Sequence, residues 1–335
     1  MRITAALVLP LVLVLSAAAC RSAEEPGKAP LILPETQPAP PQQPADESIT
    51  VALVMKTLTN PFFSAMEDGA RKAARELGIR LVVLSAADEA SVEQQTEIVR
   101  QVIRDQVDAI VIVPGHSVEM IPVLKEARDA AIVVVNIDER IDPAMAQKLG
   151  LSDVPFVGVN NENGAYLSAR HLASKLTGPT RAIIIQGDPA SSTARDRERG
   201  ALRAISEHPS IEIVAREPAH WKIDEAKAVT ARLFERYPDA GAIFCANDLM
   251  ALGAIRYLEE TGKKQVLVAA YDAIEPARAA LRRGNLVATV DQRADQQGYI
   301  GVRHAVRALA GEKLPAETFI DVELVTVDTL ARGDK

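Results

Sequence analysis

Short apolar runs alternate with amphipathic segments along the chain from residue 49 onward. The first run, residues 49–55, holds seven apolar or β-branched residues in succession, which is typical of a strand buried on both faces inside a parallel sheet. Further runs of this kind predict strands at residues 79–84, 109–113, 132–136, 156–159, 182–186, 211–215, 242–246, 266–270, 287–290 and 319–325. The segments between the runs predict helices at residues 61–77, 91–104, 118–130, 162–176, 194–207, 224–236, 248–260, 276–283 and 295–310.

The alternation of strands and helices with short connections predicts an α/β fold, with parallel sheets covered by helices on both faces. Eleven strands are many for one open sheet of this type. We therefore expect two doubly wound, Rossmann-like lobes of five or six strands each.

The connection after the first strand carries two adjacent aromatic residues. Asn60 is expected to cap a helix that Pro61 opens and Gly78 ends. Phe62 and Phe63 then lie in the first turn, at the carboxyl end of a strand, which is the edge where open α/β sheets bind ligands. The two rings could instead belong to the core, but the chain has only twelve aromatic residues, which makes a ligand contact an equal alternative.

Polar residues repeatedly occupy the positions just beyond a strand. They are Lys56, Asn60, Asn136, Asp138, Glu139, Asn160, Asn161, Asn247, Asp248, Asp272, Gln292 and Arg293. Two lobes that face each other through the carboxyl ends of their strands would bring these side chains into one cleft. Carboxylates, amides and flat rings together suit a polyhydroxylated, uncharged ring. Asn160, Asn161 and Asp248 also have a simpler interpretation as helix caps or turn residues.

The composition narrows the class of protein. Hydrophobic residues make up 48% of the 335 residues and charged residues 25%, as in a globular protein. The net charge of −7 argues against a nucleic-acid partner, which would usually require a basic patch. Between Arg195 and Arg199, three arginines at alternate positions open a helix, and we expect only one of them to face the cleft.

The first 47 residues predict an export signal and a tether. Residues 1–19 hold a short apolar run followed by small residues, which indicates a signal peptide rather than a membrane span. Cleavage could follow an ordinary small-residue site, or precede Cys20, which would then carry a lipid. Residues 20–47 contain seven prolines and no apolar periodicity, so we interpret them as a linker.

The remaining cysteine, Cys245, lies in an apolar run and is interpreted as a small buried hydrophobic residue. No cysteine–histidine spacing typical of a metal site occurs. We therefore expect no internal disulfide, no metal and no cofactor.

Residues 48–329 resemble the sugar-binding proteins of bacterial ABC importers, in the branch of the ribose-, allose- and galactose-binding proteins. The resemblance depends on Lys-Thr-Leu-Thr-Asn-Pro-Phe-Phe at residues 56–63 and on the motifs at residues 135–139, 244–253 and 288–292. Lys56, Glu139 and Trp221 make the chain most similar to the allose-binding member. The calcium loop of the galactose-binding member has no counterpart in this chain.

The resemblance implies a type I periplasmic binding protein and assigns roles to its residues. Hydroxyl groups of a monosaccharide would be bound by Asn60, Asp138, Arg197, Asn247, Asp272 and Gln292. Phe63 and Trp221 would sandwich the ring, with Phe62 beside them, and Lys56, Asn136 and Glu139 would discriminate epimers. Departures from the family pattern at Asn160, Tyr271 and Ala273 leave the identity of the sugar open.

The resemblance also implies a domain plan and partners. Residues 48–159 and 293–319 would form the N-terminal lobe, and residues 160–292 and 320–335 the C-terminal lobe, with a three-crossing hinge between them. A monomer of this kind would work in the periplasm or on the outer face of a membrane, anchored by a lipid on Cys20, and would deliver its ligand to an ABC permease.

Other functions remain as alternatives. Two cleft carboxylates could catalyse glycoside hydrolysis, but the chain has no nucleophile elbow, P-loop or G-x-G-x-x-G motif, so we expect no enzyme and no catalytic residues. A transcription repressor with this fold would need a helix-turn-helix before residue 48. A chemoreceptor partner, or a binding protein for a non-sugar ligand such as a furanosyl signalling molecule, would fit the same residues.

Overall fold

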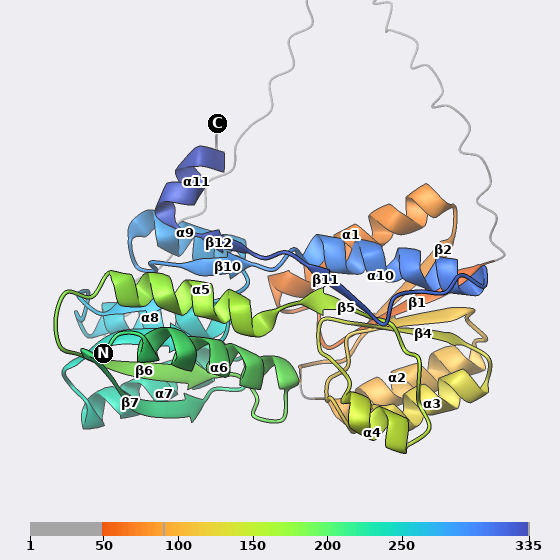
Figure 1. Ribbon diagram of the computed structural model, residues 1–335, viewed down its shortest axis with the longest axis horizontal. Helices are drawn as coiled ribbons and strands as arrows, with labels where there is room; N and C mark the ends of the chain where they lie inside the picture. Colours follow the sequence, from red (N-terminus) through yellow and green to blue (C-terminus); the bar gives the residue numbers. More distant parts are fainter. Residues whose placement is uncertain (1–48, 90, 334–335) are drawn as a thin grey trace, which may run out of the picture. The chain divides into compact units, whose positions relative to one another are not determined.

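The computed structural model describes residues 49–89 and 91–333 (Figure 1). The predicted signal peptide, the possible lipidation site at Cys20 and the proline-rich linker lie outside these residues. All described residues belong to one compact unit.

The first sheet has six parallel strands in the order β11-β5-β4-β3-β1-β2. These strands are β1 (Thr50–Met55), β2 (Arg80–Ser85), β3 (Ala109–Ile112), β4 (Val133–Ile137), β5 (Phe156–Val159) and β11 (Glu317–Ile320). Its helices are α1 (Pro61–Leu77), α2 (Val92–Arg104), α3 (Ile121–Asp129), α4 (Pro143–Lys148) and α10 (Ala294–Leu309).

Alternate residues of β1 pack on opposite faces of this sheet, as expected for a strand that is buried on both sides. Leu53 belongs to the same apolar cluster as Met66 of α1 and Val302 of α10. Val54 belongs to a second cluster, together with residues of α2 and α3. Figure 1 shows α1 and α10 on one side of the sheet and α2, α3 and α4 on the other.

The second sheet has four parallel strands in the order β7-β6-β8-β9. They are β6 (Thr180–Gln186), β7 (Ile211–Pro218), β8 (Ala240–Cys245) and β9 (Leu267–Ala269). A bridge between Ala269 and Ala288 leads to β10 (Thr289–Asp291), which pairs antiparallel with β12 (Glu323–Val325). The helices are α5 (Asn161–Ser174), α6 (Ser192–Ser206), α7 (Ile223–Arg236), α8 (Asp248–Glu260), α9 (Glu275–Arg283) and α11 (Val327–Gly333).

The α/β class and the parallel sheets expected from the sequence are confirmed. The helices at residues 61–77 and 248–260 and the strand at 156–159 have the predicted bounds. The single strand predicted at residues 319–325 is wrong, because β11 pairs with β5 of the first sheet whereas β12 pairs with β10. Periodicity also missed the short helix α4, which depends on a local cap from Asp142.

The chain passes between the two sets of elements at three places in the described residues. It leaves the first sheet after β5, returns between β10 and α10, and leaves again between β11 and β12. Strands of both sheets end at the region that contains the candidate site.

Candidate functional site

A small cavity of about 20 Å³ lies between the carboxyl ends of strands from both sheets. This volume is far below the usual range for small-molecule sites, so the side chains of its wall lie close together in this structure. Its wall consists of Lys56, Asn60, Phe62, Phe63, Glu89, Asp138, Thr193, Arg197, Trp221, Asn247, Asp272 and Gln292. Each residue follows a strand or lies in the first turns of the helix after it, which explains why the fold brings them together. A larger hollow of about 990 Å³, lined by Asn136, Phe156 and Glu317 among others, shares no lining residue with this cavity.

The N-terminus of α1 contributes the aromatic part of the wall. Asn60 caps the helix by accepting a hydrogen bond from the Phe62 amide at 3.1 Å, and its side-chain amide donates to Glu89 Oε1 at 3.2 Å. The rings of Phe62 and Phe63 meet edge to face with centroids 5.1 Å apart. Phe63 is 2% exposed, so the ring belongs to the core and to the cavity wall at the same time.

Three wall residues adopt backbone conformations that side chains normally avoid. Asp138, Trp221 and Asp272 have φ values of 62°, 66° and 115°. Gly187 makes room for the Trp221 indole, since a Cβ there would lie 2.2 Å from the ring. Residues held in such conformations concentrate at functional sites, where the surrounding structure fixes them.

Arg197 lies in α6, beside the second sheet, and contributes a positive charge to the wall while being only 3% exposed. Its guanidinium donates to Asn161 Oδ1 and to the Ala246 carbonyl, both at 2.9 Å, and to Asp272 Oδ1 at 3.2 Å. It also stacks on the ring of Tyr271, 3.8 Å from the centroid. Arg195 and Arg199, its neighbours in the arginine series, are exposed.

Asp272 and Gln292 form the most informative pair in the wall. Gln292 Nε2 donates to Asp272 Oδ1 at 2.7 Å, whereas Gln292 Oε1 is buried without a hydrogen-bond partner among the described residues. An unpaired buried acceptor costs about 1–3 kcal/mol. A ligand that donates a hydrogen bond to this oxygen would remove that cost.

The electrostatics of the wall are dominated by acids. Burial raises the pKa of Asp272 to about 7, although Arg197 opposes the shift. Burial likewise raises the pKa of Glu89 and of Asp138, against the attraction of Lys56. The pKa of Lys56 is raised, because Glu139, Asp138 and Glu89 together outweigh its burial. The wall therefore contains many hydrogen-bond acceptors, together with two cationic side chains, Lys56 and Arg197.

The polar residues that could also be helix caps or turn residues fall into two groups: those outside the cavity wall and those that line or support it. Asn160 is exposed and caps α5 through the Asn163 amide, and Asp248 is buried against Thr289 and the Ile274 amide. Neither belongs to the wall. Asn247 caps α8 and also lines the cavity, while Asn161 positions Arg197.

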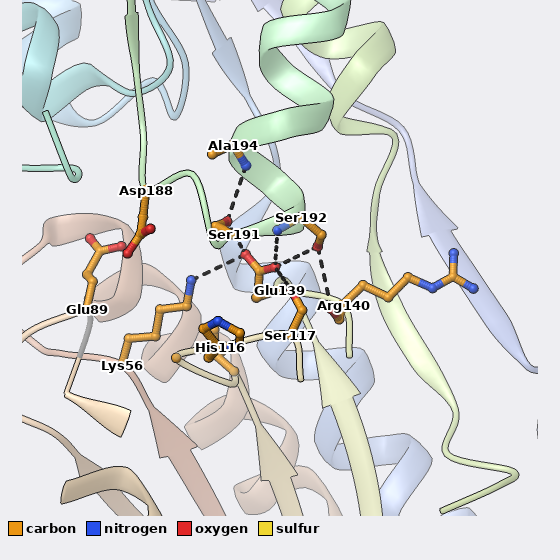
Figure 2. A network of polar contacts seen from close by, with 12 residues as sticks. Lys56, Glu89, His116, Ser117, Glu139, Arg140, Asp188, Ser191, Ser192 and Ala194 are labelled. Atoms are coloured by element: carbon orange, nitrogen blue, oxygen red, sulfur yellow. Dashed lines mark hydrogen bonds and ion pairs between the residues drawn. The ribbon is translucent and has the colours of Figure 1, made fainter. Parts of the chain in front are cut away.

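Asn136, which lies in β4, and Glu139, which follows it, are outside the wall although Asp138 between them belongs to it. Asn136 Nδ2 donates to the Glu139 carbonyl at 2.7 Å, and its Oδ1 accepts from the Ile141 amide at 3.0 Å, so this amide shapes the turn after β4. The Glu139 carboxylate is fully buried among serines and Lys56 (Figure 2). The structure therefore gives neither side chain access to the cavity.

Two wall residues, Glu89 and Thr193, were missed from the sequence. Glu89 follows the carboxyl end of β2, so the rule that selected the other polar residues would have found it if extended to this loop. Thr193 lies in the first turn of α6, in a run of small polar residues that gives no distinguishing signal.

Among the residues that the structure describes, no group of three or more His, Cys, Asp or Glu side chains is arranged to hold a metal ion. No helix in the described ranges is long and apolar enough to cross a membrane.

The fold and the wall define a class: a two-sheet α/β binding protein that encloses a small polar ligand at the ends of its strands. The profile of the periplasmic binding protein domain matches residues 51–313, and the chain belongs to this family. The homologues found for this chain are substrate-binding transport proteins and not enzymes, as the sequence indicated.

Particular relatives agree with this assignment. A D-ribose/D-allose-binding protein of Pseudomonas aeruginosa is 39% identical over 271 residues, which cover 79% of this chain and 84% of the relative. The D-allose-binding periplasmic protein of Escherichia coli is 30% identical over 277 residues, covering 82% and 89%. A periplasmic solute-binding protein of an ABC transporter from Actinobacillus succinogenes, solved with bound D-allose, superimposes with a TM-score of 0.81 at 35% identity, covering 85% and 99%. The expected type I periplasmic binding fold and the resemblance to the ribose- and allose-binding branch are thus confirmed.

Proposed function

We propose that this protein captures a monosaccharide of the allose or ribose type in the cavity and delivers it to an ABC permease. The observation that carries the proposal is the buried Gln292 Oε1, which lacks a partner in a wall otherwise rich in paired acceptors. A sugar hydroxyl donates to such an oxygen and can accept from a neighbouring guanidinium. The relatives named for ribose and allose support this class of ligand.

Every wall residue except Thr193 then has a proposed role. Phe63 and Trp221 stack on the faces of the ring, with Phe62 at its edge, because flat rings pack against C–H groups. Asn60, Asp138, Arg197, Asn247, Asp272 and Gln292 bind the hydroxyl groups. Lys56 and Glu89, which approach from the first-sheet side, select among epimers by donating to or accepting from a hydroxyl at one ring position.

Two lobes would close on the ligand about the three passes of the chain. We assign residues 48–159 and 293–319 to the N-terminal lobe and residues 160–292 and 320–335 to the C-terminal lobe, which the membership of β11 and β12 in different sheets supports. We further propose that the protein acts as a monomer in the periplasm, held to a membrane through a lipid on Cys20.

A thermal-shift panel of purified protein against pentoses, hexoses and their epimers tests the proposal. A ligand at a thousand times its Kd adds about 4 kcal/mol of stability, so a cognate sugar moves the unfolding midpoint by several degrees. Asp272→Ala should remove the shift and keep the fold. If no sugar shifts the midpoint, or if Asp272→Ala keeps the wild-type affinity, the proposed site is wrong.

A further inference from the structure

Glu139 receives an unusual number of hydrogen bonds for one carboxylate. Its Oε1 accepts from Ser117 Oγ at 2.8 Å, from the Ser192 amide at 2.7 Å and from Ser192 Oγ at 2.6 Å. Its Oε2 accepts from Ser191 Oγ at 2.5 Å and lies 3.6 Å from Lys56 Nζ. Figure 2 shows this carboxylate at the centre of the network.

Four hydrogen bonds and one ion pair enclose the carboxylate in protein groups. An ionised carboxylate offers about four lone-pair sites, and the four hydrogen bonds match that number. Glu139 is 0% exposed and is not part of the cavity wall. Direct recognition of an epimer by Glu139, as the resemblance implied, is therefore incompatible with this arrangement.

The donors come from both sides of the site. Ser117 follows β3 and Lys56 follows β1, so both belong to the first sheet, as does Glu139. Ser191 and Ser192 begin α6, which packs on the second sheet. The Ser192 amide is one of the first amides of α6 and has no partner inside that helix, and an anion at a helix N-terminus also interacts favourably with its dipole.

We propose that Glu139 is a closure latch, a positioning residue that holds the two lobes together through the N-terminus of α6 without touching the sugar. This inference rests on the proposed two-lobe function. When the lobes separate, Glu139 keeps Ser117 and Lys56 but exchanges Ser191 and Ser192 for water. Lys56 also lines the cavity, so the latch lies one side chain away from the ligand.

The energetic consequence is a shift of the closed population that applies to every ligand equally. Hydrogen bonds to a charged group are stronger than neutral ones, so loss of the cross-lobe bonds should weaken binding roughly ten- to hundredfold. Because a latch stabilises the closed form itself, its removal changes the affinity for all sugars by the same factor and leaves their order of preference unchanged.

Three variants separate the latch from other roles. Glu139→Gln places an amide among hydroxyl and amide donors, and Ser192→Ala removes one cross-lobe side chain with little disturbance. Ser117→Ala is the matched control, because it removes a hydroxyl bond of 2.8 Å, against 2.6 Å for Ser192, to the same oxygen from the first-sheet side. Ser191 is unsuitable, since its hydroxyl also caps α6 through the Ala194 amide.

Two measurements decide the proposal. The first is hydrogen exchange of the amide of residue 192 without sugar, because this amide donates to Glu139. We expect faster exchange in Glu139→Gln and in Ser192→Ala than in wild type or Ser117→Ala. Titration calorimetry with several sugars should show a uniform loss of affinity in Ser192→Ala, which leaves the Glu139–Lys56 ion pair in place. Equal exchange in wild type and Glu139→Gln, or a changed order of sugar preference in Ser192→Ala, overturns the latch. A wild type that binds no sugar overturns the proposed function instead, and the exchange experiment still tests the latch.

Discussion

Tyr271, which lies next to the site, packs its ring well but buries a hydroxyl group that forms no hydrogen bond with the described residues. Its ring supports the Arg197 guanidinium, while its hydroxyl is fully buried without a hydrogen-bond partner among the described residues. Gly164 allows this arrangement, because a Cβ at that position would lie 2.4 Å from the hydroxyl oxygen. The aromatic face is therefore the useful part of the side chain.

Tyr271→Phe should leave sugar affinity unchanged and alter the free energy of unfolding by between zero and about 1 kcal/mol in the stabilising direction. The reason is that the variant removes an unsatisfied polar group and keeps the ring. Denaturant unfolding gives the stability. Ser168→Ala is the control, since its buried hydroxyl donates to the Ala270 carbonyl at 2.8 Å and its removal should destabilise. A loss above 1 kcal/mol in Tyr271→Phe would show that the hydroxyl has a partner.

Position along the chain predicts which residues reach the cavity wall where a residue directly follows a strand. Asp138, Asn247 and Asp272 follow apolar runs, the carboxyl ends of parallel strands meet at one edge, and the structure places all three in the wall. It places Asn136 and Glu139 outside the wall, because a turn after β4 directs neighbouring side chains differently. The pattern of apolar residues shows where the strand ends, but not the conformation of the turn that follows it.

At the scale of elements, α1 and α10 approach each other through glycine. A Cβ on Gly69 would lie 1.8 Å from the Asp295 carbonyl oxygen, and one on Gly298 would lie 2.0 Å from the Met66 carbonyl oxygen. Such a close approach lets both helices cover the same face of the first sheet. It also fixes the position of the N-terminus of α1, where Asn60 and the two phenylalanines begin the wall.

Gly298→Ala should lower the free energy of unfolding by about 3 kcal/mol, because the new methyl group meets backbone atoms that cannot move aside independently. Gly178→Ala is the matched control, with nothing within 4 Å of the added atom and no positive φ. Urea denaturation of both variants measures the difference. Equal stabilities would mean that the two helices can separate without cost.

The predicted helices and strands were accurate for long periodic segments. They were inaccurate where one strand-like run is divided between two sheets. Residues 319–325 have a continuous strand pattern, yet Phe319 pairs in the first sheet and Leu324 in the group that includes β10. Local propensity is the same on both sides of the break, and only tertiary pairing distinguishes them.

For the whole molecule, buried acids in and beside the site couple stability to pH. Glu89, Asp138, Asp248 and Asp272 have raised pKa values, primarily through burial. A carboxyl group whose pKa is higher in the folded protein than in the unfolded chain binds more protons when folded. Its contribution to stability is therefore present at low pH and is lost as pH rises through the folded pKa.

We expect the sugar-free protein to lose stability between about pH 4 and pH 7, by up to about 4 kcal/mol for Asp272 alone. The window lies between the ordinary pKa of an aspartate and the value of about 7 in the folded protein. Unfolding midpoints at pH 5, 6, 7 and 8 measure the slope, and Asp272→Asn should reduce it while keeping an acceptor for Arg197. Glu139, whose pKa is lowered because Lys56 and three serines outweigh its burial, acts only at lower pH. A midpoint that rises from pH 5 to pH 8 would contradict this expectation.

The late position of β11 and α10 in the chain limits the order in which the protein can fold during synthesis. The six-stranded sheet receives its edge strand and the helix beside α1 only after residue 293, whereas β6 to β9 follow one another without interruption. A nascent chain that stops before α10 therefore lacks one of the two helices that cover this face of the first sheet. The first core can reach its native packing only when nearly all of the described chain is available.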